Sequence, residues 1–225
     1  MFAESLQLSS DFSGEVRLFP LSDLVLFPGV VLPLHIFESR YQEMLQDAVD
    51  DDQLIAMATL LPGHEHDYYS RPPVAPIVCI GQVTAHERTE SGTYNLVLVG
   101  VQPAEILHEI EPVRAFRRAS VEVLRAASEA SDASSDKMVD EDLAALVQQR
   151  IPAAEKLVRM YREGRLDTTK MVDVLAFHLP LPTDLKLQLL AESRTEVRVE
   201  MLVGALPATS AAEAPPAPPS DFSDN

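Results

Sequence analysis

The sequence of 225 residues predicts an α+β protein, in which a small barrel or rolled sheet of short, mostly antiparallel strands is followed by a helical bundle. Between Val16 and about Leu124, β-branched and apolar clusters are separated by Pro, Gly and polar turns, which is typical of short strands. From residue 138 onward, apolar residues recur at helical spacing instead. A run of Ala, Ser, Glu and Asp between these two patterns predicts a flexible linker.

These patterns divide the chain into five parts. The apolar content of 46% is enough for a core that folds unaided. The predicted parts are a flexible N-terminus (1–14), a β-barrel domain (15–125), a flexible linker (126–137), a helical subdomain (138–206) and a disordered, acidic tail rich in Pro and Ala (207–225).

In the first half, one helix is expected to interrupt the strands. Residues 37–49 place Phe37, Tyr41, Met44 or Leu45, and Ala48 on one helical face. The clearest hairpin has its turn at residues 90–92. The predicted strands are 16–19, 24–27, 54–60, 77–83, 83–88, 94–99, 104–107 and 119–124.

Three helices are predicted in the second half. Asp140 is expected to cap the first, Pro152 to break or kink it, and Gly164 to end its continuation. Asp167 or Thr168 is expected to cap the second. That helix carries Met171, Val174, Leu175 and His178 on its apolar face and ends before Pro180. Thr183 is expected to cap a third, in which the apolar positions are Leu187, Leu190, Val197 and Met201.

The charge balance narrows the classes of partner. The formal net charge of −17 repels phosphate backbones and anionic membrane surfaces, so we expect neither nucleic acid nor membrane as a partner. The single cysteine, Cys79, lies in an apolar run and favours a reducing compartment. The first residues have neither the positive charge nor the apolar stretch of a secretory signal. We therefore expect a cytoplasmic protein.

Several stretches of the chain carry a family resemblance. Residues 18–34 read LFPLSDLVLFPGVVLPL and continue as HIFESRY over 35–41. Further along, IGQV at 80–83, VGV at 99–101 and LPLPTDLKLQLL at 179–190 agree with the same pattern. Together these stretches resemble the N-terminal, substrate-binding domain of Lon-type proteases. Residues 35–41 are closer to the stand-alone Lon-domain proteins of bacteria than to the full-length protease.

The resemblance extends over residues 16–206 and implies a PUA-like pseudo-β-barrel followed by a helical bundle. In the full-length proteases, this region is a substrate-recognition and assembly domain, while ATP hydrolysis and peptide cleavage lie further along the chain. The sequence departs from the family at Ser22, where the full-length proteases usually carry Arg, and at the insertion 126–136. Both departures concern the protease's own partner contacts more than the fold.

Motifs for hydrolysis are not found in the sequence. No glycine precedes a lysine, as a P-loop requires, and no Gly-x-Ser-x-Gly nucleophile elbow is present. A Ser-Lys dyad cannot be assigned, because all four lysines lie beyond the barrel region and no serine motif accompanies them. We therefore expect neither catalytic activity nor a cofactor.

The best candidates for metal ligands are His64, His66 and Asp67, in the run His-Glu-His-Asp. Zinc ligands normally come from separated positions, and no second cluster of Cys or His accompanies this run. A solvated loop is therefore favoured over a metal site. His178, on an apolar helical face, is interpreted as a core histidine and not as a ligand.

Two further groups of residues have alternative interpretations. Glu38 and Arg40 lie in the family motif, where they are candidates for partner contacts, or else a first-turn acid and a structural ion pair. The run 50–52, three aspartates after the first helix, is interpreted as a solvated turn in preference to a cation site. Four aromatic residues are expected in the core and not in a ligand cage: Phe19, Phe27, Phe37 and Tyr41.

The preferred hypothesis is a non-catalytic module that binds unfolded or specific protein segments at the junction of barrel and helices, as an accessory or adaptor in protein quality control. The alternative is an enzyme with a noncanonical site in the loop 64–69. A third hypothesis is nucleic-acid binding, which is known among PUA-like folds. In this sequence only the basic cluster of residues 114–118 supports it. The sequence does not predict an oligomeric state.

Overall fold

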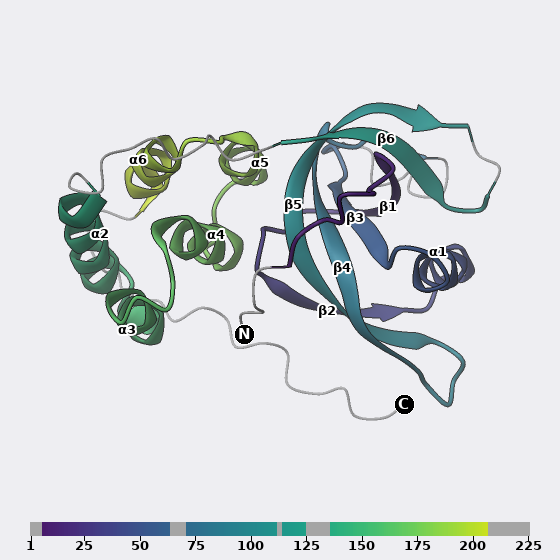
Figure 1. Cartoon of the computed structure of the whole chain (residues 1–225), viewed down its shortest axis with the longest axis horizontal. Helices are drawn as coiled ribbons and strands as arrows, with labels where there is room; N and C mark the ends of the chain where they lie inside the picture. Colours follow the sequence, from purple (N-terminus) through teal and green to yellow (C-terminus); the bar gives the residue numbers. More distant parts are fainter. Residues whose placement is uncertain (1–5, 64–70, 112–113, 125–135, 207–225) are drawn as a thin grey trace.

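The computed structural model describes residues 6–63, 71–111, 114–124 and 136–206, and Figure 1 shows their arrangement. The helices α2 to α6 form a group beside the strands, and α1 lies on the opposite side of the sheet from them (Figure 1). The strands are β1 (Glu15–Leu21), β2 (Val31–Ile36), β3 (Leu54–Thr59), β4 (Ile77–Arg88), β5 (Tyr94–Ile110) and β6 (Arg117–Val123). The helices are α1 (Ser39–Val49), α2 (Asp136–Arg150), the 3-10 turn η2 (Pro152–Ala154), α3 (Glu155–Arg162), α4 (Thr168–His178), α5 (Thr183–Ala191) and α6 (Thr195–Ala205).

Five of the strands close into a ring. Strand β1 pairs in parallel with β3 and antiparallel with β6, and β6 also pairs with β5. The order β5-β4-β3-β1-β6 therefore returns to β5, while β2 pairs with the first part of β5 outside the ring. The other described pairings are antiparallel. The predicted α+β pseudo-barrel, followed by helices, is confirmed.

Strand β5 is longer than the sequence pattern suggested. The predicted strands 94–99 and 104–107 are parts of one strand, Tyr94–Ile110, which pairs with β2, β4 and β6. Gly100 lies in its middle, where a Cβ atom would stand 2.1 Å from the carbonyl oxygen of Phe27. The close approach of the two backbones allows the N–H of Gly29 to donate to Gly100 O at 2.8 Å.

The prediction of a strand over residues 24–27 is wrong. The segment has no regular structure and follows Asp23, whose φ is 55°. Its side chains Val25, Leu26 and Phe27 are all buried in the core. The segment therefore lacks the alternation of buried and exposed positions that a half-exposed strand has. The neighbouring strand is instead β2, which carries Pro33 at the edge of the sheet, where proline is tolerated.

Helix α1 has the predicted buried face, but Phe37 is not part of it. Tyr41, Met44, Leu45 and Ala48 are buried, as the spacing predicted. The helix begins only at Ser39, so Phe37 lies before its first turn and 66% of it is exposed. The expectation that Phe37 is a core aromatic is therefore wrong, whereas Phe19, Phe27 and Tyr41 are in the core.

The acidic run after α1 binds an arginine of the same chain. Arg17, on β1, donates to Asp47 at 2.6 Å, to Asp51 at 2.8 Å and to Asp52 at 2.6 Å. Its guanidinium also donates to Asp47 O at 3.2 Å, and only 8% of its side chain is exposed. The carboxylates of Asp51 and Asp52 therefore fasten the end of α1 to the sheet.

The helical bundle follows the predicted pattern with shifted ends. Asp167 caps α4 by accepting a hydrogen bond from the backbone N–H of Lys170 at 2.8 Å, and Gly164 ends α3 with a φ of 69°. Helix α2 begins at Asp136, before the predicted cap at Asp140. His178 is exposed at the end of α4, so the expectation of a core histidine is wrong.

The predicted third helix is in fact two helices. Helix α5 ends at Ala191 and α6 begins at Thr195. In the break, Glu192 accepts a hydrogen bond from the backbone N–H of Arg194 at 2.9 Å, which takes this donor out of the helical pattern. Thr183 is the first residue of α5 and not its cap, because Pro182 takes the cap position and no side-chain cap bond forms.

The barrel and the helices share a core. One cluster of buried residues combines strand residues with Ala176 of α4 and with Leu189 and Leu190 of α5. A second cluster lies within the helical bundle, and a third joins the five ring strands. The third cluster includes four alanines, small side chains that suit the interior of a narrow ring. The division of the chain into separate domains stays a prediction.

Candidate functional site

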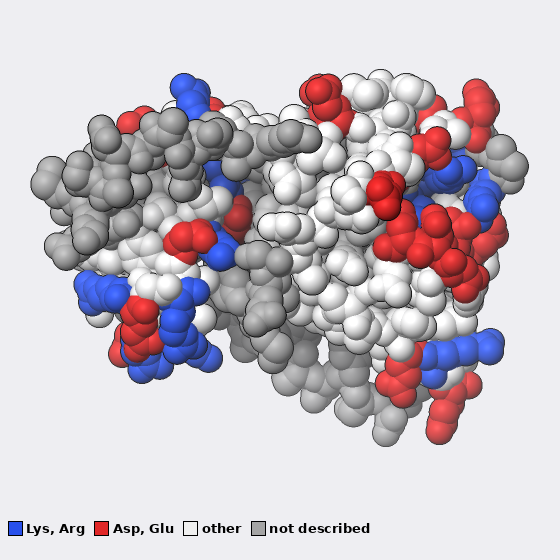
Figure 2. Space-filling view, viewed as in Figure 1, with Lys and Arg blue, Asp and Glu red and all other residues white. Residues whose placement is uncertain are grey.

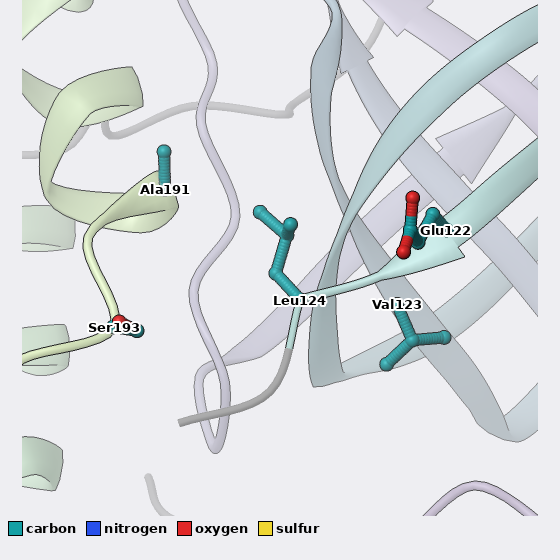
Figure 3. A pocket seen from close by; sticks show the side chains of 5 residues that line it. All are labelled: Glu122, Val123, Leu124, Ala191 and Ser193. Atoms are coloured by element: carbon teal, nitrogen blue, oxygen red, sulfur yellow. The ribbon is translucent and has the colours of Figure 1, made fainter. Parts of the chain in front are cut away.

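A groove lies between the barrel and the helical bundle (Figure 3). It encloses about 590 Å³. One wall is formed by Glu122, Val123 and Leu124 at the end of β6, and the other by Ala191 and Ser193 at the break between α5 and α6. This volume falls in the range of protein ligand pockets, about 300–1,000 Å³. The groove lies at the junction where the sequence hypothesis placed binding.

The barrel wall is held by backbone contacts. The N–H of Leu124 donates to Pro103 O at 2.9 Å, and the side-chain amide of Gln102 donates to Leu124 O at 2.6 Å. With both backbone groups of Leu124 occupied, its side chain projects from a fixed position toward the side of Ala191 (Figure 3). An apolar side chain held in this way is available for contact with an apolar ligand.

The helical wall is also fixed by polar contacts. Glu192 accepts hydrogen bonds from Arg194 Nε and Nη2, both at 3.1 Å, in addition to the one from the backbone N–H of Arg194. These bonds lower the pKa of the Glu192 carboxyl to about 2. The turn beside Ala191 and Ser193 therefore carries a carboxylate that is charged at every pH near neutrality.

Glu38 and Arg40, the predicted partner-contact residues, form an ion pair with each other. Arg40 Nη2 lies 2.9 Å from Glu38 Oε2, and its Nε donates to the same oxygen at 3.0 Å. The guanidinium carbon of Arg40 stands 4.6 Å from the centre of the Tyr41 ring. Glu38 precedes α1 and makes no side-chain cap bond to it. The two residues do not line the groove, and their role in partner binding stays a prediction.

The candidate metal ligands His64, His66 and Asp67 lie outside the described residues, as does the rest of the loop 64–69. Within the described ranges, no three His, Cys, Asp or Glu residues are grouped so that they could hold a metal ion. Over the same ranges, no helix combines the length and the apolar character needed to cross a membrane.

The charged side chains are unevenly distributed over the surface. In Figure 2, Asp and Glu gather at the right, on the barrel side, whereas a group of Lys and Arg lies at the lower left, over α3. Helix α3 carries exposed Lys156, Arg159 and Arg162, with Glu155 and Glu163 beside them. The summed charge of −17 therefore conceals one locally basic helix.

Sequence reasoning missed the residues of the groove. Leu124 was expected only as the end of a strand, and Ser193 only as part of a continuous helix. The available signal was the sequence Glu-Ser-Arg at 192–194, where three polar residues interrupt the apolar spacing of the predicted helix. Nothing in the local sequence indicates that this break faces the end of β6.

Comparisons with known proteins agree on one family. The profile described as "ATP-dependent protease La (LON) substrate-binding domain" matches residues 15–207. The Lon protease of Anaeromyxobacter dehalogenans is 24% identical over 202 residues, which cover 86% of this chain and 23% of that protein. The Lon protease of Brevibacillus choshinensis is 24% identical, with 84% and 24% covered. The chain thus spans about a quarter of the length of these relatives.

Solved structures show the same fold. The crystal structure of a Lon N-terminal domain protein from Xanthomonas campestris has a TM-score of 0.64 and 21% identity, and covers 86% of this chain and 99% of that chain. The N-terminal domain of a Mycobacterium avium complex Lon protease has a TM-score of 0.62 and 18% identity, with 84% and 96% covered. Because the profile matches most of its length, the chain belongs to the family of Lon substrate-binding domains.

Proposed function

We propose that the chain is a non-catalytic module that binds protein segments in the groove between the barrel and the helical bundle. The observation that carries this proposal is the groove itself, with fixed walls and the side chains of Val123, Leu124 and Ala191 in its lining. Glu122 at the rim and the nearby Glu192 add negative charge. Extended segments with apolar and basic residues therefore suit this surface best.

The experiment is a binding titration with fluorescently labelled casein, a largely unfolded polypeptide, followed by fluorescence anisotropy. Leu124→Asp puts a charge on the apolar wall, and Ser193→Trp fills the groove from an exposed position. We expect each variant to weaken binding by about tenfold, or about 1.4 kcal/mol. Leu107→Asp is the matched control, because Leu107 is 56% exposed on β5 and does not line the groove.

The outcomes separate the function from its location. If the wild type binds casein and all three variants retain this binding, the interaction lies elsewhere on the surface. Absence of casein binding by the wild type would contradict the proposed function itself. Thermal unfolding of each variant confirms that a loss of binding is not a loss of the fold.

We also propose that the module acts in the cytoplasm as an accessory or adaptor in protein quality control. The support is its family and the relatives named Lon protease. The test adds the chain to a Lon protease degrading casein. An adaptor raises the rate of degradation, and a competitor for substrate lowers it. An unchanged rate at saturating concentrations of the chain would count against both roles.

A further inference from the structure

A second, smaller pocket lies at the other end of β6 from the groove. It encloses about 70 Å³ and includes three arginines in its lining, Arg40, Arg71 and Arg117. Arg117 is the first residue of β6, whereas the groove is lined by Glu122 and Val123 at its end. At about 3.3 Å per residue, the two sites lie on the order of 20 Å apart along the strand. They are therefore separate sites.

The guanidinium of Arg117 is held in place with donors to spare. Its Nε donates to Glu109 Oε2 at 2.9 Å, Nη2 donates to the other Glu109 oxygen, and Nη1 donates to Pro72 O at 2.7 Å. These bonds use three of the five N–H groups of a guanidinium. Only 8% of the Arg117 side chain is exposed. The group is thus a buried, oriented donor at the pocket wall.

Arg71 brings a positive charge that the described carboxylates do not neutralise. It is exposed, and the described part of the chain provides it with no ion-pair partner. Its φ is 68°, in the left-handed region that residues with a Cβ seldom adopt.

Apart from Arg40, which is paired with Glu38, the remaining walls are apolar. The rings of Tyr41 and Phe116 and the prolines Pro20 and Pro72 line the pocket. Since a cavity needs on the order of 10–15 Å³ of this kind of volume to hold one water molecule, the pocket has room for a group of a few non-hydrogen atoms. A carboxylate with its adjoining methylene has this size, and its two oxygens match the planar fork of a guanidinium.

We propose that this pocket binds a carboxylate presented by a peptide, with Arg71 and Arg117 as the donors and the aromatic rings against the neighbouring carbon atoms. This proposal rests on the proposed function, because it takes the ligand to be a polypeptide, and it adds the chemical group that the pocket recognises. The carboxylate comes either from the C-terminus of the bound chain or from an Asp or Glu side chain, and the recognising chemistry is the same for both.

The test uses three hexapeptides with an uncharged N-terminal dansyl label in anisotropy titrations. The first, Gly-Ser-Gly-Ala-Ala-Leu, has a free C-terminus, the second is its C-terminal amide, and the third is the amide with Asp in place of the middle Gly. We expect at least one carboxylate peptide to bind about tenfold more tightly than the neutral amide. Preference for the first identifies a C-terminal carboxylate as the ligand, and preference for the third identifies an acidic side chain.

Arg71→Glu is the decisive variant, since it reverses the charge at an exposed position. We expect it to remove the preference for the carboxylate peptide, and Arg71→Lys to retain part of it. Arg165→Glu is the matched control, because Arg165 is also an exposed arginine and lies on the helical bundle, outside the pocket. The control should bind like the wild type, which excludes an effect of net charge alone.

Three results would overturn the proposal. They are equal binding of all three peptides, binding by none of them, and an Arg71→Glu variant that behaves as the wild type. Casein binding in the groove is measured on the same variants. If Arg71→Glu retains casein binding and all peptides fail, only the carboxylate pocket is wrong. If the carboxylate peptide binds and casein does not, the proposed function fails and the pocket stands.

Discussion

Asp173 and Arg198 form an ion pair inside the helical bundle, with 2% and 8% of their side chains exposed. Arg198 Nε also donates to Leu189 O at 2.9 Å, so one guanidinium joins α4, α5 and α6. Leu189 lies two residues before Ala191, which lines the groove at the end of α5. Burial raises the pKa of the Asp173 carboxyl to about 6, against the opposing effect of the Arg198 charge.

The first prediction concerns the loss of this guanidinium. Arg198→Met leaves the Asp173 carboxylate buried without its partner, and we expect a loss of about 3 kcal/mol in the free energy of unfolding at neutral pH. Without Arg198, the pKa of Asp173 rises further, so protonation relieves more of this loss as the pH falls. Urea unfolding near pH 7.5 and pH 5.5 should therefore show a larger loss at the higher pH.

The double variant Asp173→Asn with Arg198→Met is the control, because it removes both charges. Near neutral pH, the double variant should lose less free energy of unfolding than Arg198→Met. The difference in stability between the two variants should become smaller at lower pH. Equal losses for the single variant at both pH values would contradict this account of the ion pair.

The second prediction follows the pH dependence of the wild type. A raised folded-state pKa means that the folded protein retains the Asp173 proton above the ordinary value, so this group's contribution is fully present at low pH and lost as the pH rises to about 6. Relative to Asp173→Asn, which cannot titrate, the wild type should lose about 1 kcal/mol between pH 5.5 and pH 7.5. Urea unfolding of both proteins measures this difference, and a gain in place of a loss would reverse the sign of the pKa shift.

The third prediction concerns Arg17 and the acidic turn. Arg17→Met leaves Asp47, Asp51 and Asp52 close together without their shared cation, and Asp51 is largely exposed. We expect a loss of about 2 kcal/mol, smaller than for a fully buried pair because water screens part of the repulsion. Arg118→Met, which breaks a more exposed ion pair with Glu15, should cost less than about 1 kcal/mol. Comparable losses in the two variants, measured by urea unfolding, would contradict the proposed role of Arg17.

The fourth prediction compares two glycines. Gly100→Ala forces a Cβ atom against the Phe27 carbonyl, which is backbone and cannot turn away. We expect a loss of about 3 kcal/mol or failure to fold. Gly204→Ala lies in α6 with nothing within 4 Å of the new atom, and should gain about 0.5–1 kcal/mol from helix propensity. Thermal unfolding of both variants gives the two signs directly.

The fifth prediction concerns the reactivity of Cys79. Burial raises the pKa of its thiol well above the usual range, with a further contribution from the charge of Asp173. The reactive species is the thiolate, so the folded protein should not react with Ellman's reagent near pH 8 on the time scale of minutes. One thiol should react at once in concentrated urea. Rapid reaction of the folded protein would mean that the strands around Cys79 open readily.

The sequence predicted those elements whose signal is local. The turn at Gly92, the end of α3 at Gly164 and the cap at Asp167 are each determined by one residue with a special backbone or side-chain preference. The order of strands followed by helices came from two different periods, which a single sequence displays directly.

The features that could not be predicted depend on residues far apart in the chain. Residues 24–27 are as apolar as a buried strand. In the structure they are not part of a strand, and they pack into the core, where the carbonyl of Phe27 approaches Gly100. Phe37 was assigned to the helix because its spacing from Tyr41 is helical, although the helix begins after it. The groove forms because Leu124 and Ser193, which are far apart in the sequence, line the same pocket. No local sequence pattern predicts that they lie close together.

The closure of the ring has a consequence for folding during synthesis. Strand β1 has two neighbours in the ring, and β3 follows it soon in the sequence. The other neighbour, β6, begins only about a hundred residues after the end of β1. At about 5–20 residues per second, the ribosome delivers β6 on the order of 5–20 s after β1. During that interval, one edge of β1 has no partner from the ring. The nascent chain is therefore open to chaperones until the last strand emerges.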